Sequence, residues 1–201
     1  MKKLKERLKA YIEKNSWWRI AGDVIFYVFI ILMLIPATRK PIATTLIKAT
    51  MRKPRVVAES AAPELQAEDY KLEFEDMEGN ITRLEDLKDE VILLNYWATW
   101  CPPCRAEMPS LQALYNDYSE KIRMILVTNE DSNTITQFLE SNGYDLPVYI
   151  QKTNYAPSFQ VNSIPTTFLI ARNGRIVTSK TGAANWNSES FRQELDELIS
   201  E

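Results

Sequence analysis

The order of elements along the chain predicts an α/β domain over about residues 70–200. Residues 91–97 and 122–128 are nearly continuous apolar runs, a helical segment lies between them, and an Asn173-Gly174 turn separates two later apolar segments. Strands that are apolar without alternation are typical of a sheet covered on both faces. Two such strands joined through a helix run parallel, whereas the Asn-Gly turn adds an antiparallel hairpin at the edge of the sheet.

The segment before the first buried strand has the pattern of a hairpin. Tyr70–Phe74 alternates as a half-buried strand does, Glu78-Gly79-Asn80 is a turn signal, and Ile81–Leu84 is expected to pair back onto the first strand. Glu85–Lys88 is expected to form one helical turn before the central strand, Val91–Trp97.

Helices and strands alternate after the central strand. A helix is expected over about Pro103–Ser119, with a kink at Pro109, because proline removes a helical hydrogen bond. The later elements are expected to be a strand, a helix ending at Gly143, a short strand, a helical turn, two hairpin strands and a closing helix. Their ranges are Ile122–Thr128, Ser132–Asn142, Pro147–Ile150, Tyr155–Phe159, Thr166–Ala171, Arg175–Ser179 and Ser190–Ile199.

The net charge of −3 hides a strong asymmetry. Residues 1–55 hold 13 Lys/Arg and three Asp/Glu, a net charge of +10, whereas residues 56–201 hold 11 Lys/Arg and 24 Asp/Glu, a net charge of −13. A basic head followed by an apolar run suits a membrane, and an acidic remainder suits a water-exposed domain. The acidic domain also argues against nucleic acid as a partner.

The N-terminal segment predicts a single transmembrane helix, with the lipid bilayer as its partner. Seven basic residues precede the apolar segment Ile20–Pro36, and the span is long enough if it is counted from Trp17. A cleaved signal peptide and a buried core helix are the alternatives. A retained anchor is preferred because no small-x-small cleavage site follows and because the apolar run Val24–Ala37 leaves no polar face. No cysteine follows either, which excludes a lipoprotein anchor.

This interpretation divides the chain into three parts. Residues 1–38 form a basic cytoplasmic tail and transmembrane signal anchor, residues 39–63 an interfacial segment and linker, and residues 64–201 the α/β domain. The basic residues ahead of the span favour a cytoplasmic N-terminus, which places the domain outside the bacterial cytoplasmic membrane, in the periplasm or at the cell exterior. Further basic residues soon after the span weaken this bias.

Histidine is absent, and the chain has only two cysteines, Cys101 and Cys104. The absence of histidine excludes imidazole acid–base catalysis, Ser-His-Asp triads and most transition-metal sites. The two cysteines have only each other as intramolecular partners. We therefore expect no metal and no cofactor beyond a redox-active Cys101–Cys104 disulfide.

The cysteine pair lies where a buried strand ends and a helix begins. Pro102 and Pro103 suit a helix start, where a missing N–H has no cost, so Cys101 is expected at the helix N-terminus. The helix dipole and free N–H groups there stabilise a thiolate and lower its pKa. Cys104 lies one turn on and is expected to be more buried. Cys101 is therefore predicted to attack and Cys104 to resolve a mixed disulfide.

Other interpretations of the pair are weaker. A structural zinc site needs four ligands, which the chain lacks. A purely structural disulfide would stabilise little, because a two-residue loop has little closure entropy to lose. A thiol peroxidase would need a cysteine in a Pro-x-x-x-Thr-x-x-Cys setting, and neither cysteine has one.

Three strings of residues are distinctive: Asn95–Pro109, which contains Trp-Cys-Pro-Pro-Cys, then Ser163–Ile170, and the Asn173-Gly174 turn. With them, residues 70–200 resemble the thioredoxin superfamily, and within it the membrane-tethered TlpA/ResA-like thiol–disulfide oxidoreductases. The resemblance implies a thioredoxin-like fold, with a central mixed β-sheet flanked by helices. It also implies an N-terminal β-hairpin extension and a central insertion over about Asp131–Tyr155.

The resemblance implies roles for further residues. Pro165 matches a cis-proline loop beside the cysteines, where the Ile164 backbone would pair with a substrate strand; the alternative is an ordinary trans proline. Glu107 matches an acidic residue that would tune a thiol pKa or relay a proton; the alternative is a solvated helix residue. The residues expected to bind substrate are Trp100, Pro102, Pro103, Ile164 and Pro165.

One position departs from thioredoxin itself, which has a buried Asp where this chain has Asn95. An amide cannot take a proton from Cys104, so Glu107 becomes the better candidate for a general base. The catalytic residues expected are therefore Cys101, Cys104 and Glu107. No histidine lies between the cysteines, so the strong thiolate stabilisation of a DsbA-type oxidase has no obvious source.

These observations favour a membrane-anchored protein-disulfide reductase that acts on disulfide-containing proteins, with apocytochrome c as a candidate substrate. It would be re-reduced by a membrane electron donor of the thiol-reducing type. The alternatives are an oxidase or isomerase that uses the same pair, and a tethered binding module whose CxxC is a docking feature. Family habit and one acidic, unrepetitive domain lead us to expect a monomeric soluble domain.

Overall fold

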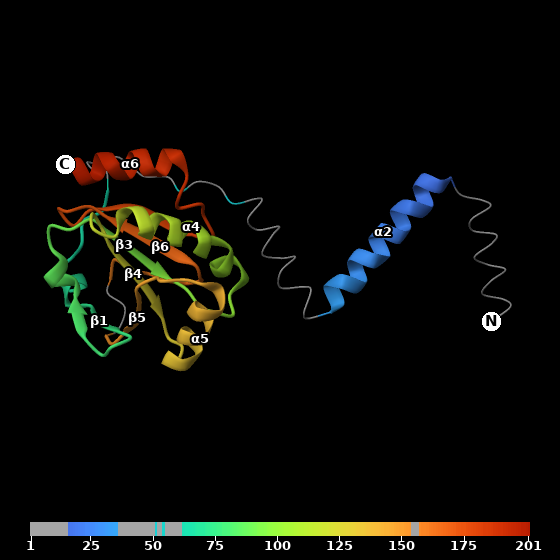
Figure 1. Ribbon diagram of the computed structural model, residues 1–201. Helices are drawn as coiled ribbons and strands as arrows, with labels where there is room; N and C mark the ends of the chain where they lie inside the picture. The colour runs from blue at the N-terminus through green and yellow to red at the C-terminus, as the bar shows by residue number, and fades with distance from the viewer. Residues whose placement is uncertain (1–15, 36–50, 52–53, 55–61, 154–156) are drawn as a thin grey trace. The chain divides into compact units, whose positions relative to one another are not determined.

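The computed structural model describes residues 16–35, 51, 54, 62–153 and 157–201 (Figure 1). The chain divides into two compact units, Met1–Ala43 and Thr44–Glu201, which are taken one at a time below. The expected basic tail, the expected interfacial segment and most of the expected linker lie outside the described residues.

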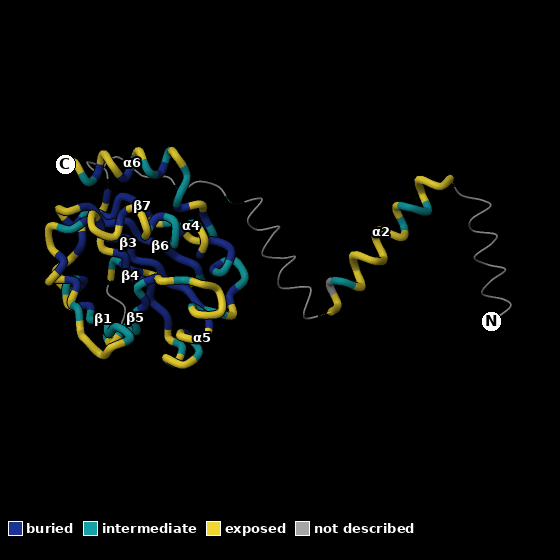
Figure 2. The backbone as a smooth tube through the Cα atoms, viewed as in Figure 1, coloured by how far each residue is buried: buried dark blue, intermediate teal, exposed yellow. Residues whose placement is uncertain are grey.

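One helix, α2 (Trp17–Leu34), makes up the described part of the first unit. The helix is largely exposed (Figure 2), and Trp17, Trp18 and Phe26 are among its exposed large apolar residues. No helix within the described ranges is long and apolar enough to cross a membrane. The predicted transmembrane helix is therefore not confirmed.

The second unit contains a seven-stranded mixed sheet in the order β2-β1-β5-β4-β3-β6-β7. Strand β3 (Ile92–Tyr96) lies between β4 (Arg123–Thr128), to which it is parallel, and β6 (Thr166–Ile170), to which it is antiparallel. Strand β5 (Val148–Gln151) is parallel to β4, and β7 (Ile176–Thr181) is antiparallel to β6. The predicted parallel pair and the predicted C-terminal hairpin are confirmed.

The predicted N-terminal hairpin is present but begins later than expected. Strands β1 (Glu73–Asp76) and β2 (Ile81–Arg83) pair antiparallel, and β1 also pairs antiparallel with β5. Asp69–Lys71, part of which was predicted as strand, forms a 3-10 turn, η2. The buried Asp69 carboxylate accepts hydrogen bonds from Gln66 N (2.7 Å) and from Ser158 N (3.0 Å) and Oγ (2.5 Å). These contacts fix the turn and keep its residues out of the strand.

The three helices of this unit match the predicted ranges within one residue at each end. They are α4 (Pro102–Tyr118), α5 (Ser132–Asn142) and α6 (Glu189–Ser200). Helix α5 ends at Gly143, whose φ of +66° is the left-handed conformation typical of a helix end. The predicted turn at Glu85–Lys88 is a 3-10 helix, η3 (Leu84–Leu87). The helical turn predicted at Tyr155–Phe159 lies partly outside the described residues.

The sheet separates two clusters of buried apolar side chains, and neighbouring residues of β3 belong to different clusters. Leu93 lies in the cluster with residues of α4, α5 and α6, whereas Ile92 and Leu94 lie in the cluster with residues of η3. Strands β3, β4 and β6 are largely buried, and more exposed elements surround them in Figure 2. The nearly continuous apolar sequence of β3, interrupted by Asn95, therefore reflects burial on both faces, as predicted.

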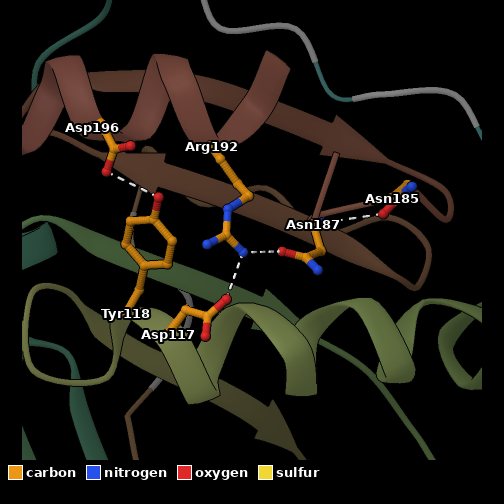
Figure 3. Close-up of polar contacts among 6 residues, drawn as sticks. All are labelled: Asp117, Tyr118, Asn185, Asn187, Arg192 and Asp196. Carbon is orange, nitrogen blue, oxygen red and sulfur yellow. Dashed lines mark hydrogen bonds and ion pairs between the residues drawn. The ribbon is translucent and has the colours of Figure 1, made fainter. Parts of the chain in front are cut away.

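Polar contacts join the end of α4 to α6 (Figure 3). Arg192 Nη1 donates to the Asp117 carboxylate (2.6 Å) and to Asn187 Oδ1 (2.7 Å), and the Tyr118 hydroxyl donates to Asp196 (2.9 Å). These contacts hold the segment that leads from β7 into α6 against α4.

Candidate active site

The chain reaches the cysteine pair through a short loop after β3. The backbone N–H of Trp97 still donates to the carbonyl of Val127 on β4 (2.9 Å), and the chain then leaves the sheet. Cys101 is the N-cap of α4, and Pro102 and Pro103 are its first helical residues. The pair therefore lies at the helix N-terminus, as predicted.

Cys101 and Cys104 form a disulfide, with their Cα atoms 5.3 Å apart. Cys101 Sγ accepts a hydrogen bond from the backbone N–H of Cys104 at 3.2 Å. After reduction, the same N–H and the helix dipole would stabilise a Cys101 thiolate and lower its pKa. Cys104 is fully buried and Cys101 is 2% exposed, so Cys101 is the more accessible residue of the pair.

The Ile164–Pro165 peptide bond is cis, as the resemblance implies. The carbonyl oxygen of Ile164 lies 3.7 Å from Cys101 Sγ. The Pro165 carbonyl accepts a hydrogen bond from the Gly182 N–H at 2.8 Å and is therefore already hydrogen-bonded within the protein. Pro165 is buried and Ile164 half-buried. The loop before β6 thus contacts the sulfur that is expected to react.

The remaining residues expected to contact substrate differ in exposure. Trp100 is 67% exposed, whereas Pro102 and Pro103 are half-buried. Trp97 is a core residue that packs on Phe138, with ring centroids 5.4 Å apart. Trp100 therefore offers a large apolar surface to another protein next to the cysteines.

Glu107 lies one helical turn after Cys104 and is fully buried. Its Oε2 accepts hydrogen bonds from Trp186 Nε1 (3.0 Å) and Ala184 N (3.2 Å), and its Oε1 accepts one from Asn95 Nδ2 (2.9 Å). Burial raises the pKa of Glu107 to about 7, although the hydrogen bonds act in the opposite direction. The alternative of a solvated helix residue is wrong, and the carboxyl is able to exchange a proton near neutral pH.

Three neighbours of Glu107 were not assigned a site role from the sequence. The Asn95 amide also donates to Thr167 Oγ1 (2.7 Å), and its Oδ1 has no hydrogen-bond partner in the described part of the chain. Ala184 and Trp186 follow Glu107 by 77 and 79 residues. No local pattern signals contacts over such a separation, so only the folded structure reveals them.

The arrangement combines a reducible sulfur pair, an adjacent cis-proline loop and a buried carboxyl whose pKa is raised to about 7. Thiol–disulfide exchange uses an attacking thiolate and a second sulfur, and a carboxyl with a pKa near 7 suits the accompanying proton transfer. Within the described ranges, no group of three or more His, Cys, Asp or Glu side chains could hold a metal ion.

Comparisons with known proteins agree with this chemistry. Residues 59–179 match the model of the AhpC/TSA family. The chain belongs to this family. It is similar to the thiol-disulfide oxidoreductase ResA of Halalkalibacterium halodurans, with 36% identity over 129 residues, which are 63% of this chain and 72% of that protein. The thioredoxin-like protein YneN of Bacillus subtilis is 30% identical over 135 residues, 65% of this chain and 77% of YneN.

Solved structures add a fold comparison for this AhpC/TSA-family chain. A putative thiol-disulfide oxidoreductase from Bacteroides vulgatus has a TM-score of 0.54 and 28% identity, covering 71% of this chain and 97% of that one. A DsbF homologue from Corynebacterium diphtheriae, with a TM-score of 0.54 and 21% identity, covers 74% of this chain and 92% of its own and shows the shared fold alone. The chain is a thiol–disulfide oxidoreductase of the ResA type with a thioredoxin-like α/β fold.

Glu107 is expected to make the stability of the oxidised protein pH-dependent. Its pKa of about 7 in the folded protein lies above the ordinary 4.5, so the folded state binds this proton more tightly than the unfolded state. The resulting stabilisation is complete below pH 4.5 and is lost as the pH rises through 7. For such a shift, the loss is on the order of 3 kcal/mol.

Urea unfolding of the oxidised protein at several pH values between 5 and 8 measures this loss, and Glu107→Gln is the comparison. The variant is expected to remove most of the fall, because the chain has no histidine to titrate in the same range. An equal fall in the two proteins would contradict the assignment.

Proposed function

We propose that this protein is a disulfide reductase that acts outside the cytoplasmic membrane on disulfides of partner proteins, with apocytochrome c as a candidate substrate. The observation that most supports this function is the Cys101–Cys104 disulfide at the start of α4, with the Ile164 carbonyl 3.7 Å from Cys101 Sγ. The exposed Trp100 beside it suits contact with a protein. Similarity to the thiol-disulfide oxidoreductase ResA supports the same class.

In the proposed reaction, the Cys101 thiolate attacks one sulfur of the substrate disulfide. A mixed disulfide forms between Cys101 and that sulfur, and the other substrate sulfur leaves as a thiolate that takes up a proton. Cys104 then loses its proton and attacks Cys101 Sγ, which releases the remaining substrate sulfur as a second thiolate. The substrate gains two electrons and two protons, and the Cys101–Cys104 disulfide is the enzyme product.

Glu107 is proposed as the group that accepts the proton of Cys104. It lies one turn along the same helix, and its pKa of about 7 allows exchange at neutral pH. Asn95, its buried neighbour, has no ionisable group. A membrane electron donor of the thiol-reducing type would return two electrons to the pair by the same exchange steps in reverse.

Reduction is preferred over oxidation or isomerisation because the reduced pair has no strong source of thiolate stabilisation. A strongly stabilised thiolate makes a DsbA-type pair oxidising. Between Cys101 and Cys104 this chain has Pro102 and Pro103, which supply neither a cationic side chain nor a backbone N–H to stabilise the thiolate. A binding module whose CxxC serves only for docking remains a different class of alternative, since it would not need reactive sulfurs.

Single cysteine variants test the proposed reaction. Reduced Cys104→Ser is expected to attack a protein disulfide and stop at the mixed disulfide, because no resolving thiol remains. Cys101→Ser is expected to lower the rate to the uncatalysed background. Turbidity from insulin reduction measures the rate, and non-reducing electrophoresis detects the trapped adduct.

Two outcomes would overturn the proposed reductase. Full biological function in a double Cys→Ser variant would favour a binding module. A wild-type protein that oxidises reduced ribonuclease faster than it reduces insulin would favour an oxidase.

The N-terminal unit is proposed to hold the redox domain on a bacterial cytoplasmic membrane. Residues 1–55 carry a net charge of +10, and α2 exposes a series of large apolar side chains. They are Trp17, Trp18, Val24, Ile25, Phe26, Tyr27, Val28, Phe29, Ile30, Ile31 and Leu34. Basic charge next to exposed apolar surface suits a bilayer with anionic headgroups.

Cell fractionation tests this anchor. The full chain is expected in the membrane pellet, and a chain that begins at Val56 is expected in the supernatant. Protease added to intact spheroplasts is expected to digest the redox domain. Recovery of the full chain in the supernatant would contradict the anchor, and protection from protease would contradict the outward orientation.

A further inference from the structure

Glu130 holds the loop that leads into the cysteine pair. It follows β4, and its carboxylate accepts hydrogen bonds from the backbone N–H and the hydroxyl of Thr99, both at 2.6 Å. The Thr128 hydroxyl donates to the same carboxylate at 3.3 Å. Thr99 directly precedes Trp100 and lies two residues before Cys101. The carboxylate therefore fixes the loop that presents the exposed indole and the reactive sulfur.

The Glu130 side chain also lines a groove beside the reactive sulfur. Residues at the carboxyl ends of the adjacent parallel strands β3 and β4 line this groove. Its volume is about 210 Å³, and its lining includes Tyr96, Trp97, Trp100, Glu130 and Ile164. Ile164 lines this groove, and its carbonyl oxygen lies 3.7 Å from Cys101 Sγ. A substrate chain whose cysteine reacts with Cys101 would therefore place the side chain next to that cysteine at the groove.

The size and charge of the groove indicate what it binds. It is smaller than the roughly 300–1,000 Å³ of pockets that hold small-molecule ligands, and it suits a single side chain. None of the ion pairs formed by the described residues involves Glu130. A carboxylate without a cationic partner beside the exposed Trp100 ring attracts a Lys or Arg side chain, whose stem packs on this ring while its head meets the carboxylate.

We propose that this groove is a subsite for a Lys or Arg side chain that flanks the reacting cysteine of the substrate protein. The inference rests on the proposed function and adds a substrate preference to it. The net charge of −13 over residues 56–201 also favours a basic substrate, because it attracts basic partners at long range. Glu130 is therefore both a positioning residue for the loop and a specificity determinant for the substrate.

Two disulfide peptides that differ at one position test the subsite. Each is cyclised through two cysteines, and the residue next to the attacked cysteine is Lys in one and Gln in the other. The reduced full-length protein is mixed with each peptide, and the second-order rate constant of disulfide reduction is measured at low and high salt. The ratio of the two rate constants is the readout, because it does not depend on how active a given variant is.

Glu130→Gln removes the charge and leaves both Thr99 contacts possible. The amide oxygen is able to accept the Thr99 N–H, and the amide nitrogen is able to donate to the Thr99 hydroxyl. Glu140→Gln is the matched control, because Glu140 is exposed on α5, does not line the groove and changes the net charge equally.

The wild-type protein is expected to reduce the Lys peptide about fivefold faster than the Gln peptide at low salt. This preference is expected to shrink at high salt, to disappear in Glu130→Gln and to persist in Glu140→Gln. Equal rates for the two peptides in the wild type, or an unchanged ratio in Glu130→Gln, would overturn the subsite while leaving the reductase in place. Failure to reduce either peptide would instead overturn the proposed function together with the subsite.

Discussion

Glu107 lies in the second turn of α4, and its carboxyl accepts hydrogen bonds from Asn95 on β3 and from Ala184 and Trp186 in the segment before α6. A buried carboxyl is tolerated only where donors surround it or where it keeps its proton. Three elements must therefore meet around this one side chain. Because Cys104 lies one turn away on the same helix, the arrangement that satisfies Glu107 also fixes the depth of the resolving sulfur.

The cysteine pair has two sides with different chemistry. On the inner side, Cys104 is fully buried and shares its helix with Glu107, whose pKa is raised by burial to about 7. On the outer side, Cys101 contacts the Ile164 carbonyl and follows the loop that Glu130 holds. In the proposed reaction, proton transfer and substrate contact are therefore separated across one disulfide. This separation suits a reaction in which one sulfur attacks a partner and the other completes the exchange inside the protein.

Much of the fold followed from local patterns. The nearly continuous apolar run of β3 predicted burial on both faces, the adjacent prolines predicted the start of α4, and Asn173-Gly174 predicted the hairpin of β6 and β7. Each of these signals lies within a few neighbouring residues. The cis bond at Pro165 came from resemblance rather than from spacing, since the same residues also permit a trans bond.

The parts that the sequence could not supply depend on contacts between distant residues. The 3-10 turn Asp69–Lys71 takes up the first two residues of the predicted strand Tyr70–Phe74, and it is held by Ser158, which binds the Asp69 carboxylate from 89 residues later. Trp186 reaches Glu107 over 79 residues, and Glu130 reaches Thr99 over 31. A burial pattern alone does not identify such partners. Glu107 was accordingly predicted as a catalytic candidate without the donors that surround it.

The reduction potential of the Cys101–Cys104 pair tests the reductase account most directly. Equilibration of the protein against glutathione or dithiothreitol, with the oxidised fraction measured at each ratio, gives this value. A potential below about −220 mV, toward that of thioredoxin, is expected for a pair whose thiolate has no strong stabilisation. A potential near about −120 mV, as for a DsbA-type oxidant, would contradict the account and make disulfide formation the better function.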